Sequence, residues 1–229
     1  KKLIAYHEAG HALTQCALDD NNMPVHKVTI IPRGQSLGST MFLPKRDTLT
    51  ESKTSLLNQI CSTLGGRVAE EVVFGEVTNG AASDIKQATK IARKMICDWG
   101  MGSLGPIALG ENQEHIFLGK EIARDRHFSE KTAQQIDDEI KGIIDFQENR
   151  ARELITKKRA QLDLMSQALI EFETIDGDLV KDIVFEKVKT LDEIKEILAK
   201  KEAEKESQAQ EQTMAENPQA FENPAATQA

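Results

Sequence analysis

The sequence predicts a mainly α-helical domain with a small β element, and three observations support this fold class. Apolar residues recur at helical spacing through most of the 229-residue chain. Aromatic residues make up only 4% of the chain, so the core is expected to consist of Leu, Ile, Val and Ala. β-Branched residues are concentrated in one segment, 25–44, which therefore predicts the β element.

The first half of the chain is expected to begin with a helix over residues 1–18, because small and apolar residues keep a helical pattern up to the polar run 19–22. The segment 25–44 predicts two strands separated by a Pro-Arg-Gly turn at 32–34. Residues 50–100 return to helical spacing and predict helices, interrupted by a Thr-Asn-Gly turn.

The second half of the chain predicts a helical part over residues 129–190, with Ser129 as its N-cap. We expect one domain to span 1–190 and a charged helix to follow at 191–205. Residues 206–229 are dominated by Glu, Gln, Ala, Asn and Pro. Such a composition buries too little apolar surface to fold, so it predicts a disordered tail.

The composition excludes several classes of protein. The net charge is -8 and the chain has no basic block, which argues against nucleic acid as a partner. Cys16, Cys61 and Cys97 are far apart, so they form neither a disulfide framework nor a cysteine zinc site. No run of about 18 apolar residues occurs, so the chain contains no predicted membrane-spanning helix.

The motif that carries chemistry is H-E-x-x-H, formed by His7, Glu8 and His11. On a helix, positions i and i+4 share one face, so both imidazoles can reach one zinc ion. Glu8 is then placed to take a proton from a water molecule on the metal, while the metal polarises a peptide carbonyl. The motif therefore predicts a zinc site with His7 and His11 as ligands and Glu8 as catalytic base.

A catalytic zinc site needs a third protein ligand, and the residues leave two carboxylates open. Asp84 stands at the start of a predicted helix, where it could instead cap that helix. Glu70 stands one helical turn from Arg67, with which it could instead form an ion pair. The spacing alone does not choose between Asp84 and Glu70.

Other histidines do not settle the third ligand. The longer zincin signature is excluded, because Thr14 and Ala17 stand where it requires Gly and His. His26 falls in a predicted strand, and His115 and His127 fall in a predicted loop. We assign no role to these three histidines.

The second predicted strand is a hypothesis for substrate contact through Gly38, Ser39, Thr40 and Met41. A glycine lets another backbone approach closely, and an extended peptide could add to this edge through main-chain hydrogen bonds. The alternative is an ordinary core strand with a glycine bulge.

Several blocks, in order, resemble the protease domain of the FtsH family of membrane-anchored AAA+ zinc metalloproteases. They include A-Y-H-E-A-G-H-A, L-G-G-R-V-A-E-E and T-N-G-A-A-S-D-I. The matching blocks are residues 5–12, 31–34, 38–44, 64–71, 78–85, 99–101, 104–106, 126–129 and 176–177. The resemblance covers roughly residues 1–185.

The resemblance implies a zinc metalloendopeptidase with one Zn²⁺ per chain, held by His7, His11 and Asp84, with Glu8 as the base. Glu70 then becomes a supporting carboxylate, or the alternative ligand. The expected substrates are unfolded or membrane-extracted proteins, and the expected assembly is a homo-hexamer. The alternative is a non-catalytic, zinc-stabilised assembly module of the same ring, which the intact Glu8 disfavours.

The resemblance also implies parts that this sequence lacks. No G-x-x-x-x-G-K-[ST] loop occurs, so ATP is expected to be used by the parent protein and not bound by this chain. We expect a membrane anchor and an AAA+ ATPase upstream of Lys1. The parent is then expected in the inner or plasma membrane with this domain on the cytoplasmic side, while the fragment itself is soluble.

Overall fold

The computed structural model describes residues 1–18, 23–32, 34, 37–44, 50–109 and 128–216. The chain forms two compact units, Lys1–Lys187 and Val188–Ala229. His115 and His127 lie outside the described residues. None of the described helices is both long enough and apolar enough to cross a membrane.

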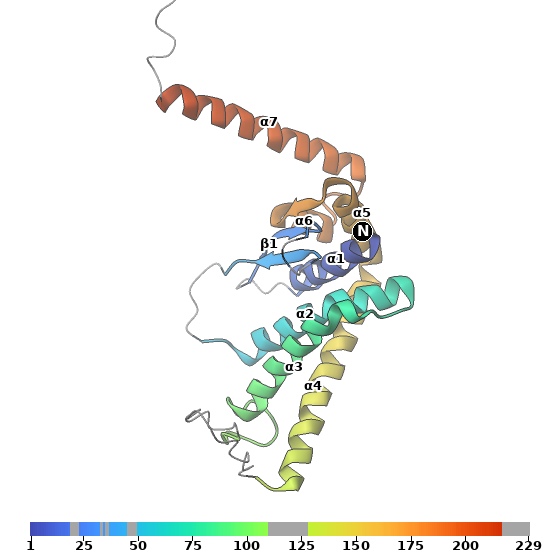
Figure 1. The fold of residues 1–229 in the computed structure, drawn as a ribbon, viewed down its shortest axis with the longest axis vertical. Helices are drawn as coiled ribbons and strands as arrows, with labels where there is room; N and C mark the ends of the chain where they lie inside the picture. The colour runs from blue at the N-terminus through green and yellow to red at the C-terminus, as the bar shows by residue number, and fades with distance from the viewer. Residues whose placement is uncertain (19–22, 33, 35–36, 45–49, 110–127, 217–229) are drawn as a thin grey trace, which may run out of the picture. The chain divides into compact units, whose positions relative to one another are not determined.

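The first unit is mainly helical with a small sheet, so the predicted fold class is confirmed (Figure 1). Its elements are α1 (Lys2–Ala17), β1 (Val25–Thr29), β2 (Ser39–Phe42), α2 (Lys53–Phe74), the 3₁₀ turn η1 (Asn79–Ala81), α3 (Ala82–Cys97), α4 (Glu130–Lys157), α5 (Arg159–Phe172), β3 (Thr174–Asp176) and α6 (Gly177–Val184). Ser129 caps α4 as expected, its hydroxyl accepting a hydrogen bond from the Thr132 amide.

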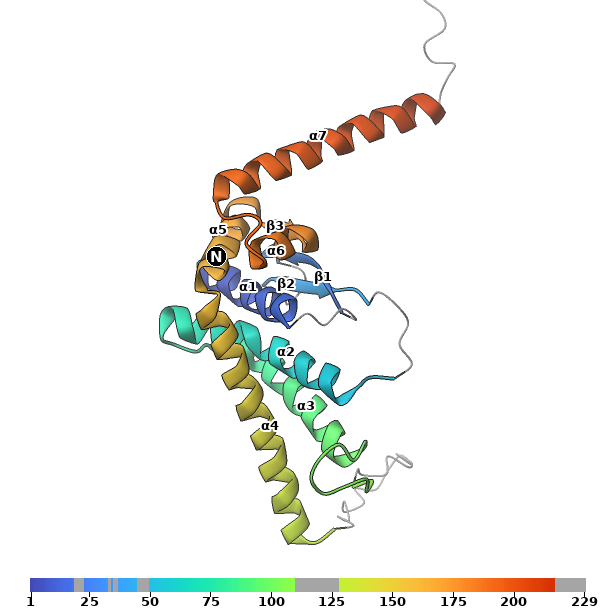
Figure 2. The ribbon, with the colours of Figure 1, turned by 180° about the vertical axis from the view of Figure 1, so that it is seen from behind.

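The sheet has the order β2-β1-β3, with β1 antiparallel to both neighbours (Figure 2). Val28 of β1 pairs with Thr40 on one side and with Ile175 on the other. The sequence predicted the first two strands and missed β3, because three residues between two helices carry no period-2 signal. Among the described strands β2 is therefore an edge strand.

Helix α1 packs closely against α2 because both helices present glycine at the contact. A Cβ atom added to Gly10 would lie 2.4 Å from the carbonyl oxygen of Gly65. Ala5, Ala9 and Ala12 are fully buried on the same helix. Small side chains let the two backbones approach, and this brings the H-E-x-x-H motif against α2.

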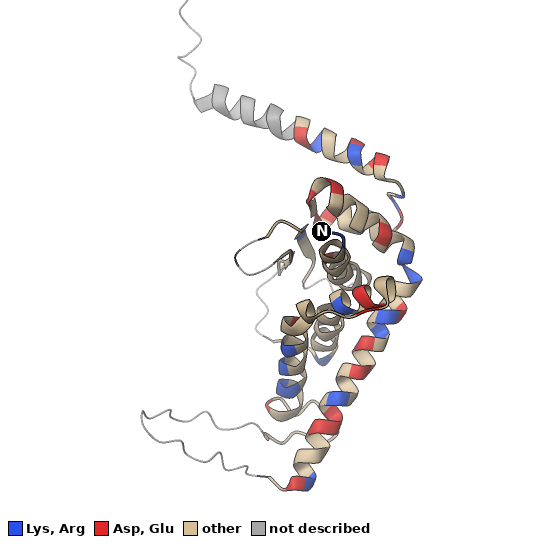
Figure 3. Ribbon diagram, turned by 45° about the vertical axis from the view of Figure 1, so that its right-hand side comes forward, with Lys and Arg blue, Asp and Glu red and all other residues tan. Residues whose placement is uncertain are grey.

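A second cluster of buried apolar residues joins α2, α3 and α4. Its members are Leu56, Ile60, Leu64, Ala88, Ala92, Met95, Ile96, Cys97, Ile136 and Ile140. Figure 3 shows acidic and basic residues along the length of α4. Some pair one turn apart, as Arg152 does with Glu148 at 3.1 Å. Arg152 also pairs with Glu71 of α2 at 3.0 Å. The cluster fixes α3, the helix whose first turn contains Asp84.

The second unit contains α7 (Leu191–Glu216). The predicted helix ended at 205, whereas the helix of the structure continues to Glu216. The added segment is rich in Ala, Glu, Gln and Lys, which have high helix propensity even where no apolar face is available. Residues 217–229 of the predicted tail lie outside the described residues.

Replacing the buried Ser166 by alanine is expected to stabilise the fold. The Ser166 hydroxyl is fully buried on α5 and has no hydrogen-bond partner among the described residues. Because a buried unsatisfied hydroxyl is destabilising and Ala favours helix, Ser166→Ala is expected to raise the free energy of unfolding by about 1 kcal/mol. Ser129→Ala removes a helix cap and is expected to lower it by about 1 kcal/mol. Urea titration of both variants checks the opposite signs; equal losses would contradict the prediction.

Candidate metal centre

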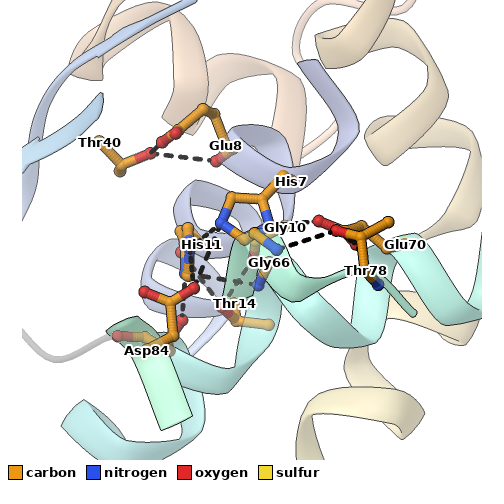
Figure 4. Close-up of polar contacts among 12 residues, drawn as sticks. His7, Glu8, Gly10, His11, Thr14, Thr40, Gly66, Glu70, Thr78 and Asp84 are labelled. Atoms are coloured by element: carbon orange, nitrogen blue, oxygen red, sulfur yellow. Dashed lines mark hydrogen bonds and ion pairs between the residues drawn. The ribbon is translucent and has the colours of Figure 1, made fainter. Parts of the chain in front are cut away.

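Three side-chain atoms meet at one point between α1 and α3 (Figure 4). The Nε2 atoms of His7 and His11 lie 3.1 Å apart. One carboxylate oxygen of Asp84, Oδ2, lies 3.2 Å from Nε2 of His7 and 3.5 Å from Nε2 of His11. The structure thus brings together the two histidines of the motif and one of the two candidate carboxylates.

The second nitrogen of each imidazole is held from α2. His7 Nδ1 lies 2.7 Å from Oε1 of Glu70, and His11 Nδ1 lies 2.8 Å from the carbonyl oxygen of Ser62. The amide of Gly66 also approaches His11 Nδ1, at 3.4 Å. At His11, the shorter contact, with the Ser62 carbonyl oxygen, decides the tautomer. A carbonyl oxygen only accepts hydrogen bonds, so Nδ1 donates. Both Nε2 lone pairs are then free to face Asp84.

This arrangement fits a divalent cation. Two nitrogen lone pairs and a carboxylate oxygen repel one another at 3.1–3.5 Å unless a positive charge lies among them. Two imidazoles and one carboxylate are a common ligand set of catalytic Zn²⁺, and three protein ligands leave a tetrahedral ion one open position. The residues present therefore fit zinc.

The electrostatics of the cluster point the same way. Burial would lower the pKa of His7, but the hydrogen bond and charge of Asp84, with the charges of Glu8 and Glu70, outweigh it and raise that pKa above 6.5. Burial would raise the pKa of Asp84, but the two imidazoles outweigh it and hold that pKa well below its usual range. The pocket thus favours a charged carboxylate and positive charge beside it.

Gly66 allows the two imidazoles to approach α2 closely. A Cβ atom at this position would come within 2.5 Å of His11 Nε2 and 2.8 Å of His7 Cε1. No role for Gly66 was predicted from the sequence. The available signal was the Gly-Gly pair inside a helical pattern, which is unfavourable for a helix unless another group approaches closely.

Glu70 links His7 to the loop that leads to Asp84. Its side chain is only 1% exposed. One oxygen accepts from His7, and the other accepts from the Thr78 hydroxyl at 3.0 Å and the Thr78 amide at 3.3 Å. Glu70 contacts the outer nitrogen of His7 and not the point where the three ligand atoms meet. Thr78 completes this link; it stands in the matching block 78–85, but no role at the site was predicted for it.

Asp84 lies in the first turn of α3, where capping was the alternative. The N-cap residue of α3 is Ala81, and no side chain makes a capping hydrogen bond there. The carboxylate of Asp84 instead approaches the two imidazoles. A carboxylate in the first turn also interacts favourably with the helix dipole, which helps to keep it charged.

Glu8 lies beside this centre and is held by β2. Its side chain is buried, and Oε2 accepts a hydrogen bond of 2.7 Å from the Thr40 hydroxyl (Figure 4). Both residues line a cavity of about 650 Å³ together with the three converging side chains. Other lining residues include Leu3, Ile4, Leu37, Gly38, Ser39 and Phe42. Of the remaining predicted site residues, Met41 is exposed, and His26 is exposed on β1.

An H-E-x-x-H helix that meets a carboxylate of a second helix, beside a buried glutamate and an accessible cavity, defines a zinc metallopeptidase. The chain belongs to peptidase family M41, whose family model matches residues 1–183. The predicted resemblance and the metalloprotease class are thereby confirmed.

Three relatives, each named ATP-dependent zinc metalloprotease FtsH, illustrate the similarity. The Thermotoga maritima protein is 50% identical over 193 residues, which are 82% of this chain and 32% of the relative. The Magnetococcus marinus protein is 52% identical over 181 residues, 79% of this chain and 27% of the relative. The Nitrosococcus oceani protein is 47% identical over 194 residues, 84% and 30% respectively. The chain thus matches only about a third of each relative's length.

Proposed function

We propose that this domain hydrolyses peptide bonds, with one Zn²⁺ held by His7, His11 and Asp84 and with Glu8 as the general base. The observation that carries the proposal is the meeting of three acceptor atoms at one point, beside a buried carboxylate in the same cavity. Glu70 holds His7 through its Nδ1 proton and is a supporting residue in this proposal.

Bound Zn²⁺ would supply Lewis acidity to the peptide carbonyl and acidify water. The Glu8 carboxylate accepts a proton from the attacking water, whose hydroxide adds to the carbonyl carbon. The C–N bond then breaks, and the proton held by Glu8 passes to the leaving amine. The Nδ1 atoms of His7 and His11 keep their protons and donate hydrogen bonds to the Glu70 carboxylate and the Ser62 carbonyl oxygen, so the imidazoles keep one orientation throughout.

The substrate is proposed to bind as an extended peptide along β2, over Gly38, Ser39, Thr40 and Met41. Supporting this, β2 is the edge strand of the described sheet and lines the cavity. Main-chain pairing tolerates many sequences, and the apolar walls suit the apolar residues that unfolded or membrane-extracted proteins expose. The alternative, an ordinary core strand, predicts no effect of β2 backbone changes on substrate binding.

We further infer that the domain is the proteolytic part of an ATP-dependent protease, as its relatives are named. In this proposal an AAA+ module of the same protein binds ATP and delivers substrate. The parent assembles as a homo-hexamer and is anchored in the inner or plasma membrane, with this domain on the cytoplasmic side. The relatives are about three times as long as their matched part, which leaves room for such segments.

Metal removal tests the proposed activity. The chain is expected to bind one zinc per molecule and to cleave an unstructured fluorogenic peptide, which needs no ATP-driven unfolding. Treatment with 1,10-phenanthroline should abolish cleavage, and one equivalent of Zn²⁺ should restore it. Zinc binding without any cleavage would favour the non-catalytic assembly module. Full cleavage by the metal-free chain would refute the proposal.

A further inference from the structure

Two residues fix the side chain of Glu8: Thr40 of β2, and Gly38, which directly precedes β2. The Thr40 hydroxyl lies 2.7 Å from Oε2 of Glu8 and 3.2 Å from its backbone oxygen. A hydroxyl donates only one proton, so the shorter contact to the carboxylate takes it. Gly38 contributes by its lack of a side chain, because a Cβ there would lie 2.7 Å from Oε1 and 2.9 Å from Cγ of Glu8.

We propose that Thr40 is a positioning residue for Glu8, so that the strand expected to bind substrate also aligns the catalytic base. This inference rests on the proposed function and deepens it. The hydroxyl fixes Oε2 and leaves Oε1, over Gly38, as the oxygen that receives the proton from water. The absence of a side chain at position 38 is thereby explained by the space that the Glu8 carboxylate needs, whether or not substrate approaches the Gly38 backbone.

Glu8 needs a residue that fixes the direction of its carboxylate. A glutamate has several rotatable bonds, and the direction of its carboxylate decides whether it can reach the attacking water. The hydrogen bond that fixes this direction comes from Thr40 of β2, and β2 is itself held in place by its pairing with β1, where Thr40 faces Val28. A shift of β2 on substrate binding would therefore move the carboxylate as well.

The kinetic test compares Thr40→Val, which removes only the hydroxyl, with Thr40→Ser, which keeps it. With the unstructured peptide, Thr40→Val is expected to lower kcat about 10- to 100-fold, with KM and zinc content unchanged, because misplacing a catalytic group by about 1 Å costs on this scale. Thr40→Ser should restore most of kcat. Thr89→Val makes the same change on α3, outside the cavity, and should match the parent.

A stability test needs no activity. In the metal-free chain, Thr40→Val should lower the equilibrium constant for folding more when Glu8 is present than in the Glu8→Ala background, where only the 3.2 Å contact of the hydroxyl with the backbone oxygen of residue 8 remains. Thr40→Ala serves as the second variant if Thr40→Val does not fold. Additive effects in this cycle, or loss of zinc with the hydroxyl, would overturn the positioning role.

The two proposals fail in different ways. If Glu8→Gln still cleaves peptide, the proposed role of Glu8 as general base is wrong, and the role of Thr40 fails with it. If Glu8→Gln is inactive but Thr40→Val keeps the parent's kcat, the proposed function stands and the role of Thr40 is refuted.

Discussion

Glu8→Gln is expected to abolish peptide cleavage and leave zinc in place. The carboxylate of Glu8 is not among the three ligand atoms that meet near Asp84. The amide has nearly the same shape and its oxygen can still accept the hydrogen bond from Thr40. It cannot take a proton from water, and loss of a general base lowers a rate about 100- to 10,000-fold. We therefore expect kcat/KM to fall by at least about 100-fold.

The measurement pairs peptide cleavage with zinc content by mass spectrometry of the native chain. Glu153→Gln is the matched control, because Glu153 is an exposed carboxylate of α4 that does not line the cavity. The control should keep both zinc and activity. Residual cleavage near the parent's level in Glu8→Gln would assign the base to another group, and loss of zinc would mean that Glu8 supports the metal.

The helices that carry the site were predictable because helical periodicity is local. The pattern of small residues predicted the first helix, and the i, i+4 spacing predicted that His7 and His11 share a face. In the structure their Nε2 atoms are 3.1 Å apart. The edge position of the second strand was not predictable, since it depends on β3 pairing with β1 from more than a hundred residues further along the chain.

The supporting contacts of the site could not be predicted from the sequence, for a related reason. Thr40 reaches Glu8 across 32 positions, and Ser62 reaches His11 across 51. Such pairs depend on how a strand or helix is placed against α1, and no periodicity encodes that placement. The choice between Asp84 and Glu70 was open for the same reason, because both stand on helices that pack near the motif.

Asp84→Ala is expected to remove zinc binding far more completely than Glu70→Ala. Asp84 approaches both Nε2 atoms, whereas Glu70 contacts the His7 ring at Nδ1, on the side away from the point where the ligand atoms meet. Losing a hydrogen-bond partner of a ligand weakens metal binding about 10- to 100-fold. Glu70→Ala should fall in that range, and Asp84→Ala should exceed it, since it removes a ligand and leaves two imidazoles.

Competition with a chromophoric chelator at fixed pH measures the two zinc affinities. Glu71→Ala is the control, because Glu71 neighbours Glu70 but pairs with Arg152 at 3.0 Å, and its zinc affinity should equal the parent's. Thr78→Val separates the two functions of Glu70: it loosens the loop before Asp84 and leaves the contact with His7. A smaller loss of zinc for Asp84→Ala than for Glu70→Ala would reverse the assignment and make Glu70 the third ligand.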